Sequence, residues 1–222
     1  MRRARQGRLA ARPVRVSATP AVRRGRGPAN GAVRIRPARP EEAAAIARVM
    51  RAAVRGQRDR YPAALLSAWG SLPALYHRWA MTAGGERYLA AARGARLVGY
   101  AAWRGGELTA LFVRPDEAGR GLGARLLARL EAEARTGGAR RLRMVAALAV
   151  VPFYAAHGWH PGRPVRSPLP GGGALPARRM WKLARRGASS GRGAAPGRLG
   201  HGGRRVSAPT SARNWPPTPA RR

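Results

Sequence analysis

Alternating glycines between an apolar run and a leucine-spaced run are the feature that most constrains this chain. Gly119, Gly121 and Gly123 follow the segment LTALFV and precede leucines at helical spacing. Glycine lets backbone N–H groups approach an anion closely, and a helix N-terminus adds partial positive charge. A strand, a glycine loop and a helix in this order therefore predict a pyrophosphate site, with a charge-assisted contact from Arg120. The plain alternative is a tight connection in a chain with 29 glycines among 222 residues.

Two common nucleotide-binding motifs are excluded by the residues around these glycines. A P-loop ends in Gly-Lys-Ser or Gly-Lys-Thr, whereas this loop ends in Gly123, Ala124 and Arg125. A dinucleotide fingerprint lies near the first strand of a βαβ unit and is followed by an acidic residue about 20 positions later. Here three apparently antiparallel strands precede the loop, and the nearest carboxylates, Glu131 and Glu133, lie on the helix that follows it.

Charge divides the chain into three zones. The formal net charge is +35, and every acidic residue lies between Glu41 and Glu133. Both ends are basic, rich in Gly, Pro and Ala, and without apolar periodicity, so they cannot bury enough surface to offset the entropy of ordering. We expect disordered Arg-rich tails at 1–32 and 185–222 around a folded domain at 33–184. The charge alone identifies no partner, because a GC-rich coding bias produces the same composition.

Several classes of site and location are excluded by what the sequence lacks. The chain has no cysteine, so it has no disulfide, no thiolate nucleophile and no Cys-ligated zinc. Its longest apolar stretch, at about 144–154, is shorter than the ~20 residues of a membrane-spanning helix. The first residues lack the apolar run of a secretory signal. We therefore expect a soluble cytoplasmic protein without a metal site or a membrane partner.

Hydrophobic periodicity predicts alternating strands and helices within 33–184. Strands are expected at 33–36, 87–92, 96–103, 108–113, 142–150 and 174–183. Helices are expected from Pro40, over 62–81 with breaks near Gly70 and Pro73, from the glycine loop to Gly137, and from Pro152 to Gly158. This order indicates an α/β (α+β) sandwich around a mixed sheet, with a sixth or seventh strand expected.

These segments together resemble the Gcn5-related N-acetyltransferase (GNAT) family. The segment LFVRPDEAGRGLGARLL is similar to the acetyl-CoA motif of that family, and VVPFYAAHGW followed by LPARRMWKL is similar to its closing segment. The resemblance covers 33–184. It implies a mostly antiparallel sheet of six or seven strands, flanked by about four helices and splayed between the fourth and fifth strands.

The resemblance also implies a binding site for acetyl-CoA. The strand at 111–113 would pair with the pantetheine arm, and the amides of 119–124 would hold the pyrophosphate. Tyr154 matches the tyrosine that protonates the leaving thiolate. Ala118 and Ala149 replace the usual Gln or Arg and a frequent Asn, so backbone amides must carry more of the binding. The implied cofactor-binding residues are Leu111, Phe112, Val113, Ala118, Gly119, Arg120, Gly121, Leu122, Gly123, Ala124 and Tyr154.

An amine acceptor must lose a proton before it attacks, because an aliphatic ammonium has a pKa near 10. Glu107 and His77 are candidate bases, although each also fits an ordinary structural role, and a water relay is an alternative. Few carboxylates against many arginines favour a small neutral or anionic amine over a polycation. The aromatic segment at 61–79 is expected either to line the acceptor side or simply to pack helices.

A competing hypothesis makes the chain a non-specific nucleic-acid-binding protein. Arginine-rich tails would neutralise phosphates without reading sequence, giving weak salt-dependent binding. Only Trp215 lies in either tail, so stacking on bases is not supported. In this alternative the domain binds coenzyme A without turnover. The sequence leaves open whether the protein is a homodimer.

Overall fold

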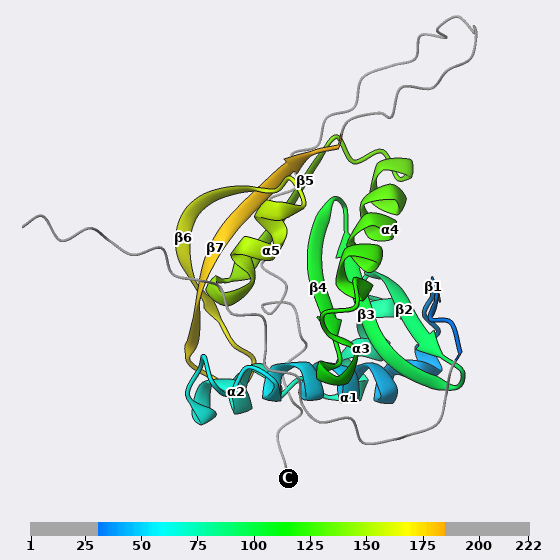
Figure 1. Cartoon of the computed structure of the whole chain (residues 1–222), viewed down its shortest axis with the longest axis horizontal. Coiled ribbons are helices and arrows are strands. Elements are labelled where there is room, and N and C mark those ends of the chain that lie inside the picture. The colour runs from blue at the N-terminus through cyan, green and yellow to red at the C-terminus, as the bar shows by residue number, and fades with distance from the viewer. Residues whose placement is uncertain (1–30, 185–222) are drawn as a thin grey trace, which may run out of the picture. The chain divides into compact units, whose positions relative to one another are not determined.

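The computed structural model describes residues 31–184, which form one seven-stranded sheet with helices on both faces (Figure 1). The strand order is β1-β2-β3-β4-β5-β7-β6. Except for residues 31 and 32, the predicted tails at 1–32 and 185–222 lie outside the described residues, so their disorder stays a prediction.

The elements follow the predicted order, with one added strand. The strands are β1 (Arg34–Pro37), β2 (Arg87–Arg93), β3 (Arg96–Arg104), β4 (Glu107–Val113), β5 (Arg141–Ala147), β6 (His160–Pro168) and β7 (Ala174–Leu183). The α-helices are α1 (Ala43–Arg55), α2 (Ala63–Trp69), α3 (Ala74–Thr82), α4 (Leu122–Thr136) and α5 (Val151–Ala156). Short 3₁₀ helices are η1 (Pro40–Glu42), η2 (Pro115–Glu117) and η3 (Leu148–Val150).

The sheet is antiparallel except where β4 meets β5. These two strands are parallel and pair only at their first residues, Glu107 with Arg143 and Leu108 with Met144. Beyond this point they diverge, as Figure 1 shows. The predicted splay between the fourth and fifth strands is therefore confirmed, and it leaves an opening in the middle of the sheet.

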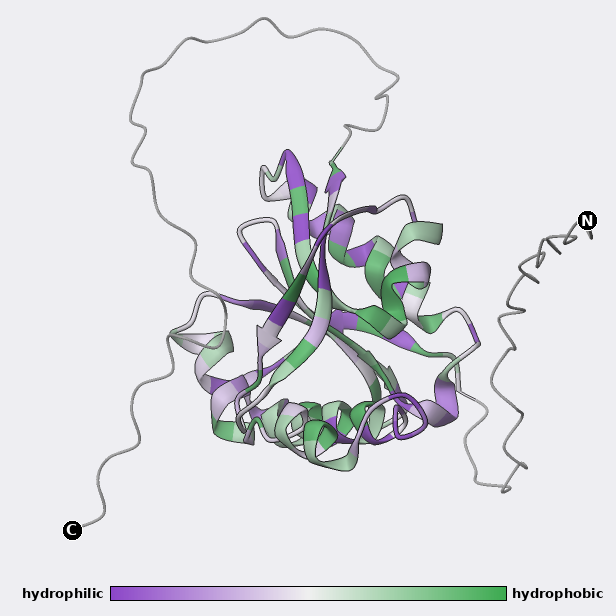
Figure 2. Ribbon diagram, turned by 90° about the vertical axis from the view of Figure 1, so that its left-hand side faces the viewer, coloured by the Kyte–Doolittle hydropathy of each residue, from purple (hydrophilic) through white to green (hydrophobic). Residues whose placement is uncertain are grey.

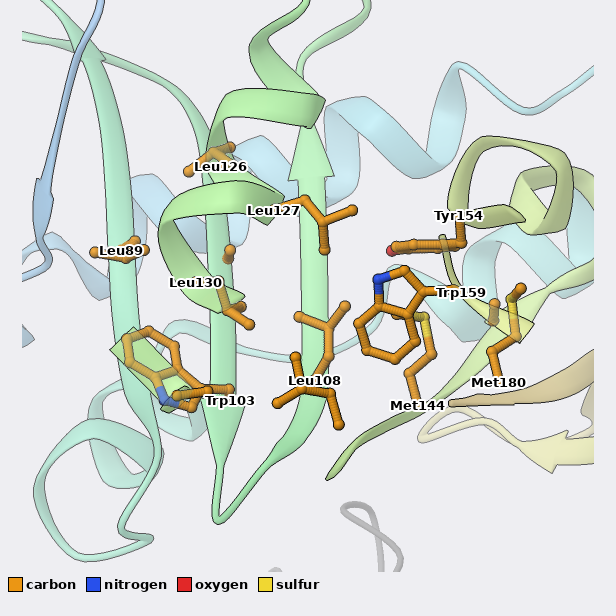
Figure 3. Close-up of a cluster of buried hydrophobic side chains, with 14 of the residues drawn as sticks. Leu89, Trp103, Leu108, Leu126, Leu127, Leu130, Met144, Tyr154, Trp159 and Met180 are labelled. Carbon is orange, nitrogen blue, oxygen red and sulfur yellow. The ribbon is translucent and has the colours of Figure 1, made fainter. Parts of the chain in front are cut away.

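Each face of the sheet has its own hydrophobic cluster. On one face, α4 and α5 bury apolar residues against the strands, including Leu126, Leu127 and Trp159 (Figure 3). On the other face, α1 and α3 cover β2 and β3 with residues such as Ile46 and Met50. Hydrophobic residues accordingly concentrate in the central strands and on the helix surfaces that face them (Figure 2). On each helix the apolar residues recur every three or four positions and form one stripe. Burial of that stripe against the sheet stabilises the helix.

Two stretches differ from the predicted elements. The segment at 160–168, which contains three prolines and for which no element was predicted, is strand β6. Proline is tolerated there because β6 is an edge strand with a register shift between Pro161 and Pro164. Strand β5 ends at Ala147, earlier than predicted, since the next three residues form η3. Among the described residues, no helix combines the length and the apolarity needed to cross a membrane.

Candidate active site

The glycine loop connects β4 to α4 through two left-handed residues. Gly119 has φ 75° and Gly121, the N-cap of α4, has φ 74°. Residues with a Cβ rarely adopt this conformation, which explains glycine at both positions. A Cβ built at either position would meet no atom within 4 Å. The surface beside both glycines is therefore open.

The backbone donors of this loop are unused. Within residues 31–184, the N–H groups of 119–124 donate no hydrogen bond, and the first bond of the helix runs from the Arg125 N–H to the Gly121 carbonyl at 3.1 Å. Helix N-termini leave such donors free, and their partial positive charge favours an anion. The predicted pyrophosphate site would use these donors. Leu122 is buried beneath it, while Ala118 and Arg120 are exposed.

Two acidic residues, which the sequence analysis did not single out, hold this loop to the sheet. Glu117 is buried and accepts two hydrogen bonds from Arg93 of β2, at 3.0 and 2.9 Å. Asp116 pairs with Arg96 at 2.6 Å. Arg120 lies 3.6 Å from the Glu117 carboxylate. The sequence feature that could have identified them is their position: two adjacent carboxylates, scarce in this chain, lie just before the glycines.

Strand β4 exposes one edge toward β5. Leu111, Phe112 and Val113 pair with β3 on one side, but no strand within residues 31–184 pairs with them on the other. A β-bulge precedes them, because Thr109 has no partner in the β3 register. Alternation along the strand places Leu111 and Val113 toward the α4 and α5 cluster and Phe112 toward the α1 and α3 cluster. An extended ligand arm has a free strand edge to follow here.

Tyr154 lies on α5, in the cluster beside this opening. It is buried, and burial raises the pKa of its phenol, so the hydroxyl keeps its proton at neutral pH. Its hydroxyl points toward Leu127 and β4 (Figure 3) and forms no hydrogen bond with any residue in the described range. The ring is fixed by edge contacts with Phe153 and Trp159, with centroids 5.0 and 6.1 Å away. Tyr154 thus presents an unused proton donor.

The two candidate bases lie in different places. Glu107 begins β4, and its carboxylate is 3.5 Å from Arg143 at the closed end of the opening. His77 is 1% exposed in the α1 and α3 cluster, so it lies on the opposite face of the sheet from Tyr154. Its Nδ1 is 3.3 Å from the Tyr88 hydroxyl. Burial, with a smaller effect of Arg51, lowers the pKa of His77 to about 4, so the ring is neutral.

A further buried carboxylate, Glu86, is bonded to the bulge of β4. Its Oε2 accepts a hydrogen bond of 3.1 Å from the Thr109 hydroxyl. Burial raises the pKa of Glu86, and the bond from Thr109 partly opposes that rise. The sequence analysis did not identify Glu86, because its position before β2 looks like part of the Gly84-Gly85 turn. Its contact with Thr109 joins residues 23 positions apart.

A cavity of about 1230 Å³ lies at the carboxyl end of β5. It is lined by α2 and the loop before it, by η3, and by the turn between β6 and β7. Of the aromatic residues predicted for the acceptor side, Tyr61 lines this cavity. Trp69 contacts Tyr61 and Phe112 at ring distances of 5.9 and 6.1 Å. Tyr76, His77 and Trp79 lie on α3 and pack within the α1 and α3 cluster.

The chain matches a known protein family in both sequence and fold. A sequence model described as the acetyltransferase (GNAT) domain matches residues 66–167. A Gcn5-related N-acetyltransferase from Rhodopseudomonas palustris has the same fold with a TM-score of 0.63. It is 27% identical, over 72% of this chain and 99% of that chain. The chain belongs to the GNAT family.

Other GNAT structures agree with the fold of this acetyltransferase. The PaiA N-acetyltransferase of Thermoplasma acidophilum, solved with coenzyme A, is 17% identical over 68% of this chain and 99% of that chain, with a TM-score of 0.55. The Salmonella typhimurium protein YncA, solved with acetyl-CoA, is 22% identical over 72% of this chain and 98% of that chain, with a TM-score of 0.54. No curated protein sequence matches this GNAT chain.

Proposed function

We propose that this acetyltransferase uses acetyl-CoA and transfers the acetyl group to the primary amine of a small neutral or anionic acceptor. The observation that carries the proposal is two stretches of free backbone, one on either side of η2. The unused N–H groups of 119–124 follow η2, and the open edge at 111–113 precedes it. Two of the structural relatives were solved with coenzyme A or acetyl-CoA.

The residues present fit this co-substrate. The amides of 119–124 would hold the pyrophosphate, with Arg120 above them, and the backbone of 111–113 would pair with the pantetheine arm. Ala118 offers no side-chain donor, so affinity depends on the backbone. Among the described residues, no group of three His, Asp or Glu side chains is arranged to hold a metal ion.

The proposed reaction is direct attack of the amine on the thioester carbonyl in a ternary complex. A C–N bond forms, the C–S bond breaks, and the thiolate takes a proton from the Tyr154 hydroxyl, which is restored by the proton that the acylated nitrogen releases. The acceptor ammonium must first give up its proton. Of the two predicted bases, Glu107 is partly exposed and fits this role better than the sealed ring of His77. A water relay would connect Glu107 to the amine.

A calorimetric titration with acetyl-CoA tests the proposal. We expect one site in the wild type and a loss of affinity of at least tenfold in Gly121→Ala, because a left-handed residue with a Cβ is strained by about 1–2 kcal/mol and moves the free donors. Gly138→Ala is the matched control. Gly138 also has a positive φ, 86°, and open space around it, but it lies past the other end of α4. Absence of binding heat in the folded wild type would overturn the proposal.

A further inference from the structure

The cavity beside α2 has two charged wall residues, and both are arginines. Arg60 comes from the loop before α2, and Arg166 from strand β6. The rest of the wall is mainly apolar or backbone, with Leu65 and Leu148 among the larger side chains. Binding pockets for small molecules combine these features, because apolar walls supply area and a few polar groups fix orientation.

This cavity borders the opening between β4 and β5. Ala149 and Pro152 line it, and Pro152 lies on the same short helix as Tyr154. The Ala149 N–H donates a hydrogen bond of 3.1 Å to the Tyr61 hydroxyl, which closes the loop before α2 over η3. The Tyr61 ring contacts the Trp69 ring, which in turn contacts Phe112 of β4. A molecule in the cavity would therefore lie next to the proposed acetyl-transfer site.

The electrostatic character of the wall is wholly positive. All nine acidic residues of the chain lie between Glu41 and Glu133, and none of them lines this cavity. Within the described part of the chain, neither Arg60 nor Arg166 lies within ion-pair distance of a carboxylate. Arg60 instead donates to the Ala149 carbonyl at 3.3 Å, which holds its guanidinium against the wall. An ammonium-rich acceptor would be repelled here, and an oxyanion would be attracted.

We propose that this cavity is the acceptor site and that Arg60 and Arg166 bind an oxyanion, a carboxylate or a phosphate, on the amine that is acetylated. The inference rests on the proposed acetyl transfer. Of the two acceptor classes proposed there, neutral and anionic, it keeps the anionic one. Guanidinium groups pair bidentately with both oxyanions, and the apolar wall takes the hydrocarbon part of the acceptor.

Matched probes separate charge from shape. ε-Aminocaproate and its amide differ in the carboxylate, and phosphoethanolamine and ethanolamine differ in the phosphate. Each probe is titrated calorimetrically into the full-length protein saturated with coenzyme A, so the measurement does not depend on turnover. We expect at least one anionic probe to bind about tenfold more tightly than its neutral partner, the effect of one charge-assisted hydrogen bond. The pair with the larger difference in affinity shows whether the cavity prefers a carboxylate or a phosphate.

Arginine variants decide whether the proposed residues cause the preference. Arg166→Gln and Arg60→Gln should each remove most of it. Arg163→Gln, an exposed residue of β6 that does not line the cavity, should keep it. Equal binding of both members of each pair, or an unchanged preference in both cavity variants, would overturn the inference. A coenzyme A titration in the same samples tests the proposed function separately, because absence of coenzyme A binding would contradict acetyl transfer itself.

Discussion

Tyr154 illustrates how the surroundings of one residue decide its chemistry. Its phenol is packed between Phe153 and Trp159, and burial keeps it protonated. Its hydroxyl is neutral and has no hydrogen-bond partner in the described domain, so it is available to donate a proton to a leaving thiolate. Removing the hydroxyl leaves the ring contacts intact, so this residue can be tested cleanly.

We predict that Tyr154→Phe lowers the rate of coenzyme A release by about 100-fold, the lower end of the usual effect of a general acid. Affinity for acetyl-CoA should change less than threefold. A thiol-detection assay with the preferred acceptor measures the rate, and calorimetry measures the affinity. Tyr100→Phe, on the other face of the sheet, is the control for loss of a buried hydroxyl. A Tyr154→Phe rate within twofold of wild type would refute the acid role.

His77 makes folding stability depend on pH. Its folded pKa of about 4 lies below the ordinary value of 6.5, so the unfolded chain binds the proton more readily. Stability from the neutral ring is complete above about pH 6.5 and is lost as pH falls toward 4. Between pH 7.5 and 5 the loss is about 2 kcal/mol.

This pH dependence can be measured by urea unfolding at both pH values. His77→Gln should lose about 2 kcal/mol less than wild type between them, because glutamine does not titrate. His160→Gln, which changes an exposed histidine of β6, should retain the full wild-type loss. If wild type and His77→Gln lost equal stability, the neutral buried state of His77 would be disproved.

At the scale of elements, the glycine loop depends on its ion pair with β2. Breaking a buried pair by removing one partner costs more than losing an exposed pair, because one charge is left without compensation. We predict that Glu117→Gln lowers the free energy of unfolding by about 1–3 kcal/mol and weakens acetyl-CoA binding roughly three- to tenfold through lost loop order.

The matched control is Glu133→Gln, which breaks the exposed pair of α4 with Arg129. Exposed pairs contribute about 0–1 kcal/mol, so this variant should leave both stability and acetyl-CoA affinity nearly unchanged. Chemical denaturation and calorimetry on the same two variants give the comparison. Identical acetyl-CoA affinity in Glu117→Gln and wild type would show that the loop is ordered by other contacts.

At the scale of the whole domain, few backbone pairs join the two halves of the splayed sheet. Besides the short β4–β5 pairing, Glu131 of α4 accepts hydrogen bonds from Trp159 at 2.8 Å and from Lys182 of β7 at 2.7 Å. Lys182 is the only lysine in the chain, and it also donates to the His157 carbonyl. This buried junction ties α4 to the β5–β7 half while the opening stays free.

We predict that Glu131→Leu destabilises the domain by about 2–3 kcal/mol, less than for a fully buried pair because Lys182 is partly exposed. The double variant Glu131→Leu, Lys182→Met should regain at least half of that loss, since the partly buried ammonium of Lys182 is then removed and the remaining partner, Arg135, is more exposed. Urea unfolding of wild type, Glu131→Leu and the double variant measures their free energies of unfolding. A double variant no more stable than Glu131→Leu alone would argue against the junction as described.

Local chemistry alone was sufficient to predict much of this molecule. Glycine at φ values that other residues avoid, leucines at helical spacing on α4, and the Pro-Phe-Tyr helix all express short-range rules, so the loop, the helix and the position of Tyr154 could be located from the sequence. The family resemblance added the splay of β4 from β5, which short-range rules do not contain.

Long-range contacts decided the rest. No strand was predicted at 160–168, and its three prolines are tolerable because β6 is an edge strand. The partner of Glu117, the contact of Glu86 with Thr109, the sealed core position of His77 and the cavity between Arg60 and Arg166 each depend on segments far apart in the chain. Sequence by itself determined which segments could bend, coil or extend and which loop needs glycine, because those preferences belong to single residues and their near neighbours. Only the tertiary structure decided which charges were paired, buried or left facing a cavity, because desolvation and ion pairing depend on what the fold brings alongside.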